Sequence, residues 1–173
     1  EAYLDQLSDT ERQTLPSQPF YSTPEYQQKF LGVMHGSTRA STADDPMKKR
    51  FAAQLLRDNQ MADTIVKAHH AHPQHQIIHL NGTFHSESHL GTVASVKQLA
   101  PQLKLAVISP IQIPLGTSVP DSHPTMLGDY VYYIASLPND FVDPQKRAAA
   151  LQQRFAKADQ AAQSCRSFPL GEY

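Results

Sequence analysis

Residues 76–91 read QIIHLNGTFHSESHLG, and this stretch decides the fold. Gln76–Asn81 is a short apolar run that ends at an Asn-Gly pair, a pattern typical of a buried strand in a parallel sheet. Ser86 or Ser88 can then cap a helix that continues to about Leu99. The stretch therefore predicts a strand, a turn and the start of a helix in direct succession.

A second apolar run, Leu103–Ile108, follows the expected helix. Strand, helix and strand in this order form a βαβ unit, whose connection is nearly always right-handed. Tyr130–Ala135 gives a third expected strand, and the strongest helix signal runs from Asp45 to about His70. The pattern predicts an α/β fold with a parallel sheet at its core and flanking helices.

The length of 173 residues fits one domain with a sizeable core. We expect a helical and irregular lead-in at 1–45, the core at 46–163 and a tail at 164–173. The chain begins at Glu1 rather than Met, so either a leader has been removed or the chain is the C-terminal part of a larger α/β domain. No apolar run reaches the roughly 20 residues that span a bilayer.

Charge and cysteine content exclude several classes of partner and site. The formal net charge is −1 and the basic residues are scattered, apart from the run at 48–50, so we expect no nucleic-acid binding. The single cysteine, Cys165, excludes an internal disulfide framework and a multi-cysteine zinc site. Its position in a C-terminal tail is also a weak context for a catalytic thiol.

Asp58 lies on the apolar face of the long helix, seven residues after Phe51 and seven before Ile65. A carboxylate that is buried there without partners would be costly. We therefore expect Asp58 to be largely buried and hydrogen-bonded to the turn between Gly82 and His85.

Two histidines, His85 and His89, follow the first expected strand, and ligands of open parallel sheets bind beyond the carboxyl ends of strands. We expect both imidazoles on one rim, beside a helix N-terminus that supplies donors for an anion. One interpretation is a ligand or metal-cofactor site in which Asp58 or Glu87 orients one ring. The other is a turn whose histidines cap backbone groups. Phe84, Leu90 and Met126 are candidate apolar walls.

Other candidate groups have simpler structural explanations. A second group of histidines follows the long helix (His69, His70, His72, His75, His79). Most of them lie at or near the helix C-terminus, where cations are mildly favourable. His79 is interpreted as a core histidine. The tyrosines of the third strand are interpreted as strand residues rather than haem ligands (Tyr130, Tyr132, Tyr133). The sequence has no nucleophile elbow, no His-Glu-x-x-His pattern and no phosphate loop.

Two segments together resemble the ChaN-like haem-binding lipoprotein family. They are the helix QLLRDNQMA at 54–62 and the strand and turn IHLNGTFH at 78–85, followed by Gly91. The family has an Ala-Gln, Asp, Met-Ala helix followed by a strand and a Gly-x-x-His turn. The resemblance covers about 46–109 well, including the next expected strand, and the rest loosely.

The resemblance implies an iron-regulated bacterial lipoprotein that binds haem and assists iron uptake at the periplasmic or outer-membrane surface. It implies haem held by a tyrosine with an assisting histidine across a homodimer, and a lipid anchor that lies outside this chain. Asp58, His85 and His89 carry over as cofactor-binding residues, whereas no tyrosine lies in a matching motif. The family's opening strand, which ends in Gly-Glu-x-His, has no counterpart in 1–45, so the chain resembles the C-terminal part of the domain.

Three hypotheses follow. The first is a haem-binding protein of iron acquisition, which the resemblance favours over an enzyme. The second is a metal-dependent hydrolase related to erythromycin esterase-like and Tiki-type proteins, with His85 and an acidic residue as base or ligand. The third is a non-catalytic scaffold domain.

Overall fold

The computed structural model describes residues 4–34, 46–121, 124, 126–138 and 142–166. The chain forms two compact units. The larger unit holds residues 1–113 and 117–134, and the smaller unit holds 114–116 and 135–173. Within the described ranges, no helix is long and apolar enough to span a bilayer.

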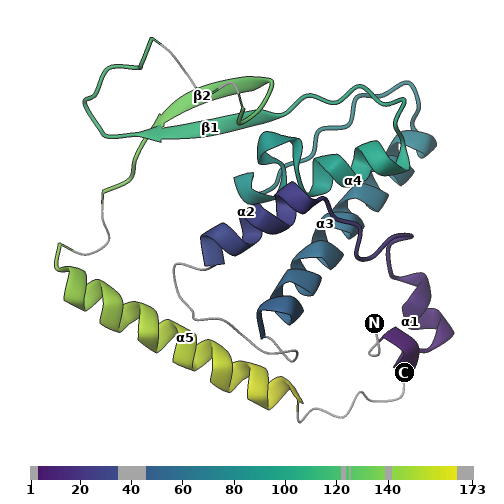
Figure 1. Ribbon diagram of the computed structural model, residues 1–173, viewed down its shortest axis with the longest axis horizontal. Helices are drawn as coiled ribbons and strands as arrows, with labels where there is room; N and C mark the ends of the chain where they lie inside the picture. Colours follow the sequence, from purple (N-terminus) through teal and green to yellow (C-terminus); the bar gives the residue numbers. More distant parts are fainter. Residues whose placement is uncertain (1–3, 35–45, 122–123, 125, 139–141, 167–173) are drawn as a thin grey trace. The chain divides into compact units, whose positions relative to one another are not determined.

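The larger unit begins with two short helical segments and a longer helix, η1 (Leu4–Gln6), α1 (Asp9–Gln13) and α2 (Pro24–Met34) (Figure 1). Ser8 and Glu11 form a capping box at the start of α1, in which each side chain bonds the other's backbone N–H. Thr23 accepts the N–H of Tyr26 at the start of α2, and Pro24 occupies the first turn, where its missing N–H costs nothing.

Helix α3 (Pro46–Ala71) carries the core of the larger unit, as its apolar periodicity predicted. Leu55, Ala62 and Val66 are buried along one face. Ala62 and Val66 pack with two residues of the next helix and its end, Val96 and Ala100. The core therefore lies between two helices, α3 and α4.

Helix α4 (Thr92–Leu99) begins later than predicted. The residues before it form two 3₁₀ turns, η2 (Thr83–His85) and η3 (Glu87–His89). Ser88 and His89 have φ of 61° and 59°, so neither can continue into a helix from Ser86 or Ser88. Gly91, with φ of 55°, then turns the chain into α4.

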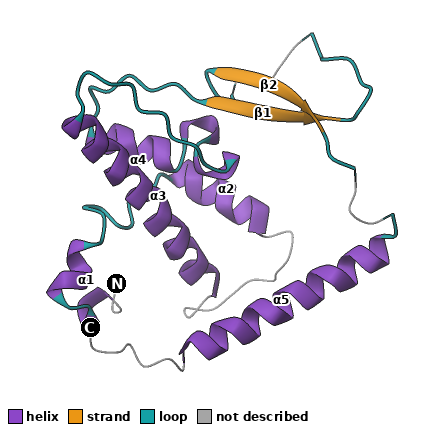
Figure 2. Cartoon of the chain, turned by 180° about the vertical axis from the view of Figure 1, so that it is seen from behind, coloured by secondary structure: helices purple, strands orange, loops and turns teal. Residues whose placement is uncertain are grey.

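The described residues form one two-stranded parallel sheet, β1 (Ile108–Ile113) and β2 (Tyr130–Ala135) (Figure 2). The mixed α/β class and the strand at 130–135 are confirmed. The strand predicted at Gln76–Asn81 is wrong, because the segment is extended but no described residue pairs with it as a neighbouring strand. The strand predicted at Leu103–Ile108 begins only at Ile108.

The described part of the smaller unit is mainly α5 (Pro144–Arg166). Asp143 caps it by accepting the N–H of Gln145 at 2.8 Å. The side chain of Cys165 lies outside the described residues.

Candidate functional site

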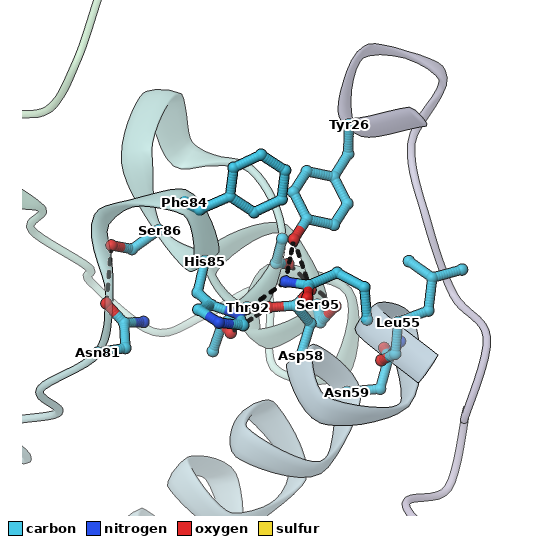
Figure 3. A network of polar contacts seen from close by, with 12 residues as sticks. Tyr26, Leu55, Asp58, Asn59, Asn81, Phe84, His85, Ser86, Thr92 and Ser95 are labelled. Atoms are coloured by element: carbon cyan, nitrogen blue, oxygen red, sulfur yellow. Dashed lines mark hydrogen bonds and ion pairs between the residues drawn. The ribbon is translucent and has the colours of Figure 1, made fainter. Parts of the chain in front are cut away.

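Asp58 is completely buried in the middle of α3, and its carboxylate binds side chains from three other segments (Figure 3). The hydroxyl of Tyr26 on α2 donates to Oδ2 at 2.6 Å. The hydroxyl of Thr92 at the start of α4 donates to Oδ1 at 3.0 Å, and Nδ1 of His85 lies 2.7 Å from the same oxygen. The predicted burial of Asp58 and its bond to the 82–85 turn are confirmed. These donors offset the desolvation of the carboxylate.

The bond to Asp58 fixes the orientation and tautomer of His85. The amide nitrogen of Gln54 also lies 3.0 Å from Nδ1, but two donors cannot share a bond. We assign the ring proton to Nδ1, from which it is donated to the carboxylate of Asp58, the closer of the two neighbours. The lone pair of the neutral ring is then on Nε2, which has no hydrogen bond among the described residues. His85 is thereby prepared to accept a proton or to ligate a metal.

Tyr26 holds its proton in this network. Burial raises the pKa of Tyr26 well above its ordinary range, and the hydrogen bond to Asp58 raises it further. Gln54, one turn before Asp58, donates to the Tyr26 oxygen at 3.0 Å. A neutral phenol that already donates to a buried carboxylate is a structural donor rather than a phenolate ligand.

Gly91 allows the backbone to pass against this network. A Cβ at this position would lie 2.6 Å from the backbone oxygen of His85, 3.1 Å from the Tyr26 ring and 3.2 Å from Asp58 Oδ1. Its φ of 55° is also a conformation that side chains disfavour. Glycine is therefore required where the turn closes over the carboxylate.

Lys29 on α2 anchors the turn that carries His85. Its ammonium lies 3.4 Å from the backbone oxygens of both Phe84 and Glu87, and 3.2 Å from the Glu87 carboxylate. The same ammonium lies 4.9 Å above the centre of the Phe84 ring. Of the two carboxylates that could orient a ring, Asp58 bonds to His85, whereas Glu87 pairs with Lys29.

His85 lines a hollow of about 530 Å³ on the surface of the larger unit. The other lining residues come from the end of α1 and from one face of α3 (Thr14, Leu15, Leu56, Arg57, Gln60, Met61). Leu15, Leu56 and Met61 give it apolar walls, and Arg57 is an exposed cation at its edge. Its size falls in the range of small-molecule sites, roughly 300–1,000 Å³.

His89 binds a different carboxylate. Its Nε2 lies 2.8 Å from Oδ2 of Asp129, which also accepts the N–H of Val107 at 2.7 Å. The Val107 N–H, and secondarily His89, hold the pKa of Asp129 below its usual range. His89 does not line the hollow that His85 lines. The structure thus brings Asp58 and His85 together and links His89 to the start of β1.

The walls expected from the sequence lie elsewhere. Phe84 packs in an aromatic cluster with Tyr26 and Phe30, and Met126 is exposed. His79 is exposed rather than a core residue. Among the described residues, no three His, Cys, Asp or Glu side chains gather around a common point.

Sequence reasoning missed three members of the network: Tyr26, Gln54 and Thr92. Gln54 had a usable signal, because residues four apart on a helix share a face and it precedes Asp58 by four. Tyr26 and Thr92 are separated from Asp58 by 32 and 34 residues, and only the packing of α2 and α4 brings them in.

One family model matches the chain, over residues 1–96, and its description is haem-binding uptake, Tiki superfamily, ChaN. The match therefore spans more than half of the chain and includes Tyr26, Asp58, His85 and His89. No curated protein and no solved structure matches the chain significantly.

Proposed function

Because the chain belongs to the ChaN family of haem-binding uptake proteins in the Tiki superfamily, we propose that it binds haem in the hollow beside His85. The observation that carries this proposal is the bond from His85 Nδ1 to the buried carboxylate of Asp58. A carboxylate on one ring nitrogen fixes the imidazole and raises the basicity of the other, as it does for many metal-ligating histidines.

His85 would hold the iron through Nε2. Histidine is a common protein ligand of haem iron, so the His85 ring could supply such a ligand. Asp58 is a positioning residue in this account, since it acts through the His85 ring. Tyr26 supports Asp58 and keeps its proton, so we do not assign it as the axial tyrosine that the family resemblance implies.

The walls of the hollow suit the rest of the ligand. Leu15, Leu56 and Met61 offer apolar contact to a porphyrin face, and methionine adapts well to flat aromatic surfaces. The guanidinium of Arg57 can pair with a propionate carboxylate through two parallel hydrogen bonds. Together these residues provide an iron ligand, an apolar wall and a counter-charge.

Haem titration followed at the Soret band tests the proposal. His85→Ala should weaken binding about 10- to 100-fold, by analogy with lost metal-shell contacts. His89→Ala is the matched control, since its ring binds Asp129, and we expect it to change affinity less than threefold. Circular dichroism shows whether each variant folds. Unchanged affinity and an unchanged Soret band in a folded His85→Ala protein would exclude His85 as the ligand.

A periplasmic or outer-membrane location, a lipid anchor and a haem-linked homodimer belong to the same proposal. They rest on the family resemblance alone. Fractionation of cells that express the natural gene, and the mass of the protein with and without haem, test location and dimerisation separately.

A hydrolytic role is the second candidate, because a carboxylate-oriented histidine is also the arrangement of a general base. In that role Nε2 of His85 would take a proton from water. Failure of haem binding together with ester or amide hydrolysis that requires His85 would favour it.

A further inference from the structure

Two extended segments of the larger unit, 77–81 and 104–107, have backbone groups that bond to no described residue. Among the described residues, no backbone hydrogen bond involves residues 77–81. In the second segment, Val107 alone is paired with described residues, namely Asp129 and Tyr130. Unpaired backbone groups on an extended segment are available to an added strand.

The two segments both line one groove with a volume of about 420 Å³. From N-terminus to C-terminus the two segments run in the same direction in space, and both lie over the pair α3 and α4 (Figures 1 and 2). The lining also includes apolar side chains of α3 and α4, namely Ile65, Val93 and Val96. The groove thus has two hydrogen-bonding segments and apolar side chains in its lining, which are the surroundings of a central strand in a parallel sheet.

The wall at 77–81 exposes large apolar side chains. Ile78 and Leu80 are 85% and 89% exposed. A strand paired beside this segment would contact these side chains as cross-strand neighbours, which contributes roughly 0.2–1 kcal/mol per pair. The second wall continues directly into β1, so a strand in the groove would join the existing sheet.

We propose that this groove binds a β-strand from outside the 173 residues, paired in parallel with both walls by strand addition. The occupant has β-branched apolar residues toward α3 and α4. Lys104 and His79 are the basic side chains in the lining, and no described Asp or Glu lines it, so the occupant is neutral or acidic rather than basic. The bound strand gives a four-stranded sheet in which 77–81 is an edge strand.

The test uses the full chain and a capped octapeptide of alternating Val and Thr with a C-terminal Glu. Its control peptide has Lys in place of Glu, and a second control has a central Pro. We expect the first peptide to bind in fluorescence anisotropy and to slow amide exchange at least about tenfold in 77–81 and 104–106 together. The Lys peptide should bind more weakly, and the Pro peptide should not bind.

Two variants of Ile78 separate backbone pairing from apolar contact. Ile78→Pro removes one N–H from the wall and should weaken peptide binding about fivefold or more, whereas Ile78→Val should leave it nearly unchanged. Protection of one wall only, protection outside the groove, or equal binding of the Pro peptide would overturn the proposal. So would protection of both walls by self-association without peptide, which would make a second copy the occupant. Haem binding at His85 is independent of every outcome.

Discussion

The two ends of the segment 76–91 differ in how their polar groups are satisfied. At its carboxyl end, the 82–91 turn bonds to α2 and α3, and its imidazole reaches the buried Asp58. At its amino end, 77–81 exposes apolar side chains and has no backbone partner among the described residues. The comparison teaches that the site is built by helix packing and does not depend on a sheet. We therefore expect mutations to be costly in the Asp58 network and nearly neutral in the extended segment.

The largest effect is expected for Asp58→Ala. The substitution leaves Tyr26, Thr92 and His85 without their common acceptor in a buried site, and we expect about 3–5 kcal/mol of lost unfolding free energy in denaturant titrations. Asp63→Ala is the matched control on the same helix, because its carboxylate pairs with the exposed Lys67. Equal losses for the two variants would contradict the special status of Asp58.

Gly91→Ala comes next. The added Cβ would meet the His85 backbone oxygen at 2.6 Å, and the φ of 55° disfavours a side chain. We expect a loss of about 2–3 kcal/mol, measured by urea unfolding. Gly32→Ala, in α2 with open space around the added carbon, should stabilise by about 0.5–1 kcal/mol. If Gly91→Ala left the free energy of unfolding unchanged, the turn would not close over Asp58.

Tyr26→Phe removes one donor and should cost about 1.5–2 kcal/mol near neutral pH. Because the folded-state pKa of Tyr26 is raised, its contribution is complete below about pH 10, the unfolded value, and is lost as pH rises toward the folded value. Wild type should therefore lose stability above pH 10 more steeply than Tyr26→Phe in thermal unfolding. Parallel pH profiles would mean that Tyr26 is not buried against the carboxylate.

The smallest effect is expected for Ile78→Thr. The side chain is 85% exposed, so the free energy of unfolding of this chain should change by less than about 0.5 kcal/mol. Val96→Thr introduces a threonine in the core and should lower the free energy of unfolding clearly more. A large loss for Ile78→Thr would show that the extended segment is already covered in solution.

The sequence predicted the elements that local periodicity determines. The start of α3, its buried face and the burial of Asp58 follow from apolar spacing and one carboxylate on that face. The strand at 76–81 was wrong because a strand needs a neighbour, and apolar residues alone do not supply one. Tyr26 and Thr92 could not be assigned to the site from local patterns, since helix packing brings them to Asp58.

The central claim is that Asp58 positions His85 so that Nε2 can hold haem iron. Hyperfine spectroscopy of ferric haem bound to protein with ¹⁵N-labelled histidine tests it most directly. We predict coupling to one histidine nitrogen in wild type and in His89→Ala, and its loss in folded His85→Ala. A histidine coupling that persists in His85→Ala, or that is absent from wild type, would contradict the account.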